Sequence, residues 1–179
     1  NNIAIGKLAM GVGDVSGASN IAIGTNAMDA LTSGACNIAL GINAYGTAVA
    51  GQNNIAIGDT AMGACLVTGY DNIAMGRTAM DDITTGFYNI GIGKDALCAS
   101  TTGCYNVALG NSSLAASTTG CFNVALGYLA LGAGVLACGG AGQAEGNIAI
   151  GTSALTKITQ GTNNIGIGLT SGDALTTGT

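Results

Sequence analysis

Asn20-Ile21-Ala22-Ile23-Gly24 is the stretch that decides the fold, because the same five-residue pattern occurs ten times. The copies begin at Asn2, Asn20, Asn37, Asn54, Asn72, Asn89, Asn106, Asn123, Asn147 and Asn164. Every copy starts with Asn and ends with Gly, as in Asn72 to Gly76 and Asn106 to Gly110, with Ile or Val at position 2 and Ala or Gly at position 3. The copies are 17 or 18 residues apart, except for one interval of 24. A fixed period of this length is typical of a solenoid, in which one short coil stacks on the next.

The pattern predicts an all-β fold, a parallel β-solenoid of about ten coils that forms a single domain over residues 1–179. Aliphatic residues at positions 2 and 4 of each coil, with a small residue between them, are typical of a short, half-buried strand. Glycines in the rest of the coil mark the turns. The long interval places a seven-residue insertion in the eighth coil, within 132–146, which we expect to bulge from the stack as a loop.

Position 3 suggests a lateral contact. If Ile21 and Ile23 point inward, position 3 points outward, and it is Ala or Gly in all ten coils. An unbroken row of such small residues indicates that another backbone packs close to this face. The alternative is that small residues simply suit a tight coil.

The composition argues against several classes of function. Only 7% of the residues are charged, compared with about 25% in average proteins, and a net charge of −5 does not favour nucleic acid. No apolar run approaches the roughly 18 residues of a membrane span, so we expect no membrane insertion. With no His and four basic residues in the chain, we find no candidate general base or activated nucleophile. We therefore predict neither an enzyme nor a cofactor or metal site.

The first-position Asn residues are best explained by a ladder, in which each side chain hydrogen-bonds to its equivalents one coil up and one coil down. A second column holds Cys104, Cys121 and Cys138. Stacked residues have Cα atoms about 4.8 Å apart, which a disulfide tolerates, so two of the three could pair. Cys98 and Cys104 flank one turn and form an alternative pair. Another alternative is that all of these residues stay reduced as small apolar groups.

Two further columns contain aromatic and charged residues. Tyr88, Tyr105 and Phe122 share one column, which predicts a ladder of stacked rings or, as an alternative, a ligand-binding stripe. Asp59, Arg77 and Lys94 share another, which predicts a solvent-exposed ladder of ion pairs of small energetic value.

The two ends of the chain are in phase. Counted through to Asn2 of a following copy, the ten intervals add up to the 179 residues of the chain. Solenoids that stay monomeric carry polar caps, and neither end shows such a cap. We expect stacking contacts at Asn2, Ile3 and Ile5 at one end and at Asn164, Ile165, Ile167 and Leu175 at the other. A head-to-tail contact of this kind does not close, and its product is a filament.

The repeated Asn-Ile-Ala-Ile-Gly motif, with a small residue at position 8, resembles the head repeats of YadA-like trimeric autotransporter adhesins. It is also similar to the Asn-x-Ala-Ile-Gly repeats of some phage and bacterial surface fibres. The resemblance covers essentially the whole chain and implies a left-handed parallel β-roll displayed outside the cell. In those adhesins three rolls pack together. The coil here is longer than in the adhesin heads, these residues include no coiled-coil stalk or membrane anchor, and both ends are in phase, which favours a filament subunit.

Three functions follow as alternatives. The first is a structural subunit of an extracellular or cell-surface filament whose partner is another copy of the same chain. The second is a homotrimeric adhesin or tail-fibre head segment that binds a surface. The third is ice binding, suggested by the Thr pairs at 84–85, 101–102 and 118–119, although this column is interrupted at 49–50 and at Gln160.

Overall fold

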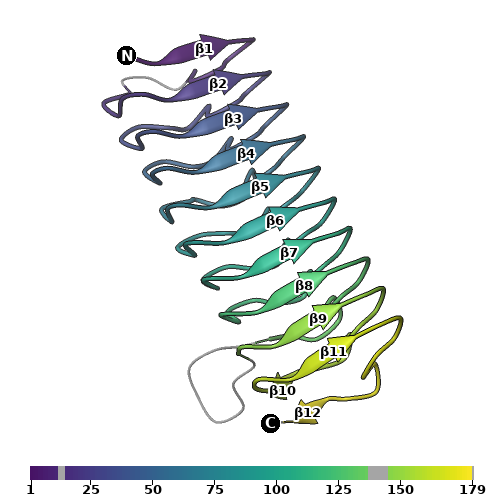
Figure 1. Ribbon diagram of the computed structural model, residues 1–179. Helices are drawn as coiled ribbons and strands as arrows, with labels where there is room; N and C mark the ends of the chain where they lie inside the picture. The colour runs from purple at the N-terminus through teal and green to yellow at the C-terminus, as the bar shows by residue number, and fades with distance from the viewer. Residues whose placement is uncertain (12–14, 137–144, 179) are drawn as a thin grey trace.

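The computed structural model describes residues 1–11, 15–136 and 145–178. Over these residues the chain forms a β-solenoid without helices, in which each coil contributes one three-residue strand to a ten-stranded parallel sheet. The strands, in spatial order, are β1 (Ile3–Ile5), β2 (Ile21–Ile23), β3 (Ile38–Leu40), β4 (Ile55–Ile57), β5 (Ile73–Met75), β6 (Ile90–Ile92), β7 (Val107–Leu109), β8 (Val124–Leu126), β9 (Ile148–Ile150) and β11 (Ile165–Ile167). Figure 1 shows the coils as a single stack with the two termini at opposite ends. The predicted fold class is confirmed.

The register follows the repeat without slippage. Ile73 pairs with Ile90 and Ala74 with Gly91, and each other pair of neighbouring strands is aligned in the same way, including the pairing across the long eighth coil. Near the last coil, β10 (Gln160–Gly161) pairs with β12 (Thr177–Gly178) in a small second sheet. The predicted insertion loop lies largely at 137–144, outside the described residues.

Hydrogen bonds between coils continue beyond the strands. Met80 N donates to Ala96 O (2.9 Å) and Thr84 N donates to Thr101 O (2.9 Å), each contact joining one coil to the next. The backbone therefore satisfies its polar groups mainly along the axis of the stack rather than within a coil.

The side chains of each strand face the opposite way from our prediction. Position 3 points into the core, where Ala22, Ala74 and Ala108 are fully buried. The side chains at positions 2 and 4 point outward and are half-buried or exposed. The expectations that Ile21 and Ile23 point inward, and that copies pack laterally on the Ala/Gly column, are therefore wrong.

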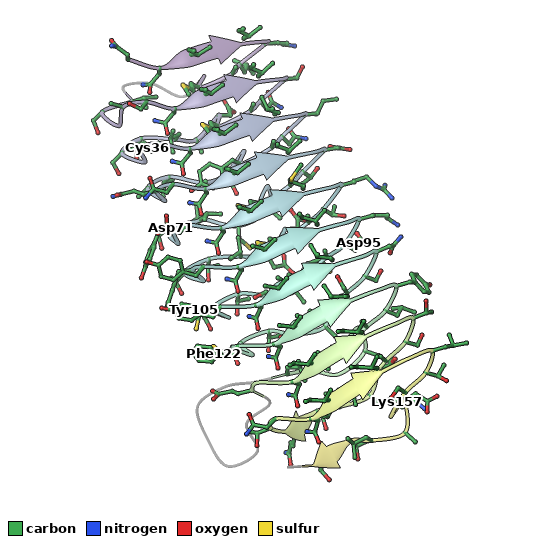
Figure 2. All side chains as sticks on the ribbon, in the orientation of Figure 1. Cys36, Asp71, Asp95, Tyr105, Phe122 and Lys157 are labelled. Carbon is green, nitrogen blue, oxygen red and sulfur yellow. The ribbon has the colours of Figure 1, made fainter. Side chains whose placement is uncertain are left out.

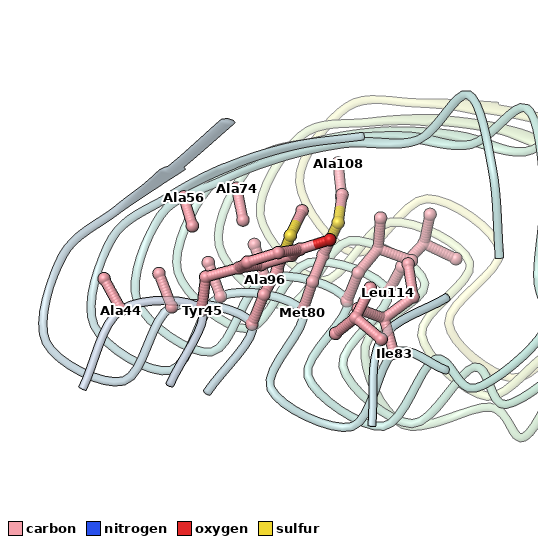
Figure 3. Packing of buried hydrophobic residues seen from close by; sticks show 14 of the residues in the cluster. Ala44, Tyr45, Ala56, Ala74, Met80, Ile83, Ala96, Ala108 and Leu114 are labelled. Carbon is pink, nitrogen blue, oxygen red and sulfur yellow. The ribbon is translucent and has the colours of Figure 1, made fainter. Parts of the chain in front are cut away.

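The reason for this orientation is the thinness of the roll. The core consists of the position 3 residues of the sheet and of residues from the rest of each coil, which are mostly Ala, Met and Leu with a few Ile, Val and Tyr. Figure 3 shows Ala56 and Ala74 facing Ala96 and Met80 across this narrow interior. A methyl group added at Gly91 would already lie 3.0 Å from Met80 Cε, so the space opposite the Met column admits only Ala or Gly.

The turns require unusual backbone conformations. Residues at positions 7, 9 and 17 have positive φ angles although most are not Gly, as in Thr78 (55°), Met80 (51°) and Tyr88 (55°). This conformation costs roughly 1–2 kcal/mol for such a residue. The chain keeps these positive φ angles because the hydrogen bonds between coils and the packing of the buried Met and Leu side chains together outweigh the cost.

Candidate functional site

The Asn ladder runs through the molecule from Asn2 to Asn164 and holds the coils in register. At Asn72, which is fully buried, the side-chain Nδ2 donates to Asn54 Oδ1 (3.0 Å) and to Gly86 O (2.8 Å). Its Oδ1 accepts from the backbone N of Asn89 (3.1 Å) and from Asn89 Nδ2 (3.0 Å). Each rung thus connects three coils, which confirms the predicted structural role of this column.

One rung of the ladder differs because of a residue that the sequence did not single out. Tyr45 replaces Met or Leu at position 9 and is fully buried, and Asn54 Nδ2 donates to its hydroxyl oxygen (2.9 Å). Burial raises the pKa of Tyr45 well above its usual range. The hydroxyl is therefore a neutral partner of the ladder.

The two end coils expose groups that inner coils cover. At position 4, Ile5 is 58% exposed and Ile167 is 66% exposed, compared with 39% for Ile23 and 36% for Ile150. A methyl group on Gly151 would lie 2.5 Å from Gly168 O, whereas one on Gly168 would meet no described atom within 4 Å. The first and last coils of the structure thus leave exposed groups that coil-to-coil contacts cover inside the stack.

The outer surface of the sheet is a second candidate site, which we call the aliphatic face. It comprises positions 2 and 4 of all ten strands, and every residue there is Ile, Leu, Val or Met. Among them, Met75, Ile92 and Leu109 are each 38% exposed. Because an exposed apolar patch can serve as an association surface, this face is a candidate site for contact with another macromolecule.

The third candidate site is an aromatic edge, formed by Tyr70, Phe87, Tyr88, Tyr105 and Phe122 on successive turns. The rings of Tyr88 and Tyr105 stack with centroids 5.1 Å apart, and those of Tyr105 and Phe122 stack 5.0 Å apart, which confirms the predicted ladder. A second stacked pair, Tyr70 and Phe87, lies beside them. Figure 2 places Tyr105 and Phe122 along one edge of the stack, with Asp95 at the opposite edge. Because the faces of the stacked rings cover one another, solvent reaches mainly the edges of the rings.

The cysteine column lies next to the aromatic edge. Cys104 Sγ donates to Cys121 Sγ across 2.9 Å. Cys138, the third predicted member, lies outside the described residues. The alternative pairing of Cys98 with Cys104 is not supported, because Cys98 Sγ donates to Ala115 O (3.5 Å) in the next coil. Burial, together with the carboxylate of Asp95, raises the pKa of Cys98.

The charged residues do not form the predicted ladder. Lys94 Nζ lies 3.2 Å from Asp95 Oδ2, its neighbour in the chain, while Asp59 accepts a hydrogen bond from Thr60. No ion pair joins Asp59, Arg77 and Lys94, all of which are described. The side chains at position 6 are too exposed to hold a fixed pairing geometry. Thr78 donates to Asp95, and this hydrogen bond is the main cause that lowers the pKa of Asp95.

The described residues show little of what a catalytic or metal site requires. They contain no group of three or more His, Cys, Asp or Glu side chains arranged to hold a metal ion. Within the described part of the chain no helix has the length and apolarity needed to cross a membrane. The absence of an enzymatic function remains a prediction.

Comparisons of this chain with protein-family models, with curated proteins and with solved structures found no match. The resemblance to adhesin head repeats therefore remains a prediction based on the motif.

Proposed function

We propose that this protein is a structural subunit of an extracellular filament, in which copies add head to tail by continuing the β-solenoid. The observation that carries the proposal is the complementarity of the two end faces. β11 pairs with β9 in the register of the inner strands, and Asn164 continues the ladder, so the outward side of β11 would offer a following coil the same kind of strand edge and ladder group. The first coil of a second copy, which begins with Asn2 and Ile3, could take the place of the coil that would follow β11. The contacts between neighbouring coils repeat along the chain, so this coil would make the same contacts there.

Burial supports the same proposal. Adding a coil to either end would cover Ile3 and Ile5 or Ile165 and Ile167, all of which are more than half exposed. Covering apolar surface stabilises an assembly by about 25 cal/mol per Å². The unpaired edges of β1 and β11 would also gain the backbone hydrogen bonds that inner strands already have.

Electron microscopy of the purified 179-residue chain tests the proposal. We expect filaments of uniform width with an axial repeat of about 48 Å, the height of ten coils at roughly 4.8 Å each. Discrete particles that do not elongate at any concentration would contradict head-to-tail stacking.

A matched pair of variants makes the test specific. Inside the stack, Ile148 N donates to Asn164 O of the following coil (2.8 Å). The equivalent donor on Ile165 points toward a coil that follows β11. Ile165→Pro removes this outward donor and places the proline ring at the open edge, so it should stop elongation while the circular dichroism spectrum stays unchanged. Ile165→Val keeps the donor and should still form filaments.

A homotrimeric fibre head is the second candidate, and the aliphatic face favours it. Three copies packed through this face would cover the exposed side chains of Met75, Ile92 and Leu109. Met75→Lys should disrupt side-by-side association while it leaves both end faces intact, whereas Ile165→Pro should block the axial contact. Sedimentation analysis showing trimers that persist in Ile165→Pro and dissociate in Met75→Lys would favour this second candidate.

Ice binding has less support. The hydroxyls of Thr84 and Thr101 donate to carbonyl groups of the next coil, Thr101 O (3.0 Å) and Thr118 O (3.2 Å). Because these two hydroxyls donate their protons to carbonyl groups of the protein, fewer Thr hydroxyls are left to order water at an ice surface.

A further inference from the structure

We propose that Cys104 and Cys121 form a redox-active pair that closes into a disulfide and covalently joins the sixth and seventh coils. The two sulfur atoms lie 2.9 Å apart at the same position of successive coils. Phe122 N donates to Cys104 O (3.0 Å), so the backbones of the two coils are hydrogen-bonded beside the pair. Neighbouring parallel strands are separated by about 4.8 Å, within the range of Cα separations that a disulfide spans without movement of the backbone.

The surroundings of the pair hold the two sulfurs together. The ring of Tyr105, next to Cys104, stacks on the ring of Phe122, next to Cys121, with an interplanar angle of 5°. This contact fixes the relative height of the two coils at the cysteine column. Oxidation would therefore join two atoms that the fold has already placed in contact.

The two thiols differ in access, which gives the reaction an order. Cys104 is half-buried, whereas Cys121 is only 3% exposed. With oxidised glutathione as the oxidant, the thiolate of Cys104 attacks one sulfur of the glutathione disulfide and releases one glutathione thiolate. The thiolate of Cys121 then attacks Cys104 Sγ, the mixed disulfide breaks, and a second glutathione thiolate leaves. Two protein thiols are oxidised, one glutathione disulfide is reduced to two thiols, and two protons pass to the solvent or to the glutathione.

Other cysteines of the chain serve as internal controls. The pKa of Cys65 is raised by burial and by the nearby carboxylate of Asp82, and the pKa of Cys98 is raised by burial and by Asp95. A raised pKa lowers the fraction of reactive thiolate at neutral pH. These two cysteines should therefore react more slowly with the oxidant than a thiol of ordinary pKa does.

The experiment is peptide mapping of the full chain after incubation with oxidised glutathione, alkylation of the remaining thiols and digestion under denaturing, non-reducing conditions. Chymotrypsin suits the sequence because it cleaves after Tyr105 and after Phe122, which separates Cys104, Cys121 and Cys138 into different peptides. We expect one linked pair of peptides. Because Cys98 and Cys104 lie in the same chymotryptic peptide, fragmentation of the linked pair should place the bond between Cys104 and Cys121 and the alkyl group on Cys98, and Cys65 should also be alkylated. Cys121 linked to a different cysteine, or both thiols recovered as alkylated, would overturn the proposal.

Thermal unfolding gives a second measurement that does not depend on the digest. Closing a loop of this length should raise Tm by roughly 5–10 °C, and dithiothreitol should reverse the increase. Cys104→Ser and Cys121→Ser should each abolish the redox-dependent shift, and Cys98→Ser should retain it. A shift of the same size in Cys104→Ser would show that another pair is responsible. The inference does not depend on filament formation, because both coils belong to one molecule.

Discussion

Replacement of one inner Asn by Ala is the most direct test of how the coils are held together. Asn72 is fully buried, and its side chain takes part in four hydrogen bonds that reach three coils. Asn72→Ala removes all four at once. The Ala methyl group fits the site, so the change creates no steric conflict.

The magnitude follows from the groups that lose their partners. The backbone N of Asn89 and the carbonyl of Gly86 are left without the Asn72 side chain at a site closed to water. Asn89 Nδ2 keeps its bond to Gly103 O (2.8 Å), and Asn54 Oδ1 keeps its bond to Asn72 N (3.0 Å). Each buried group left unsatisfied costs about 1–3 kcal/mol. We therefore expect the free energy of unfolding to fall by about 3–5 kcal/mol, which corresponds to a decrease in Tm of roughly 6–20 °C.

Urea denaturation followed by circular dichroism measures this loss, and hydrogen exchange shows where it acts. Protection should fall first in the coils that begin at Asn72 and Asn89, because each coil of a solenoid depends on its neighbours. Asn164→Ala is the matched control. Asn164 is only partly buried, so water replaces its lost hydrogen bonds and we expect a change below about 1 kcal/mol. Equal losses in the two variants, or a loss below about 1 kcal/mol in Asn72→Ala, would refute a stabilising role for the buried ladder.

Three other predictions test the core and the electrostatics. Ala74→Leu should lower the free energy of unfolding by about 1–3 kcal/mol in urea denaturation, because the side chain points into a filled interior; an unchanged midpoint would mean that position 3 faces outward. Ser117→Ala should raise stability by about 1 kcal/mol, since Ser117 Oγ is buried and has no hydrogen-bond partner in the described structure. Ser113→Ala is the control and should lower stability, because Ser113 Oγ donates to Gly110 O (2.9 Å). Asp95 has a pKa below its usual range, so its contribution to stability is present above the ordinary Asp pKa and is lost as the pH falls through the lowered value. Thr78→Val should raise the pKa of Asp95, as followed by NMR titration of the carboxyl group; an unchanged titration curve would show that the Thr78 hydroxyl is not the main cause.

Much of the fold was predictable because the repeat fixes which residues are neighbours. Once Asn72 and Asn89 occupy the same place in successive coils, their side chains must meet, and the ladder follows. The stacking of Tyr105 on Phe122 and the contact of Cys104 with Cys121 follow from the same argument. In each case the period alone determines the contact, and no knowledge of the path of the chain within a coil is needed.

The orientation of the strand was not predictable from its alternation. An aliphatic, small, aliphatic pattern shows that one set of side chains faces inward, but it does not show which set, and the larger set is the usual choice. Here the interior is so thin that it holds only the methyl group of Ala74 opposite Met80. The signal in the sequence was the column of Met and Leu residues at position 9. These side chains already fill the core, so the large residues at positions 2 and 4 have to face outward. The positive φ angles at residues such as Thr78 and Met80 were also missed, because neither is a residue type that signals this conformation.

The corrected orientation changes how assembly should work. With Ile and Leu outside, the side-by-side association proposed above would involve a face that runs the full length of the stack and contains no polar side chain at positions 2 and 4. Head-to-tail addition would lengthen this face by ten strands for each copy, so the apolar surface available for side-by-side packing grows with the filament. Side-by-side packing in turn holds two ends near each other, which raises the effective concentration for the next axial contact. Axial and lateral contacts should therefore reinforce each other, and a change confined to the aliphatic face, such as Met75→Lys, should shorten filaments even though it leaves both end faces intact.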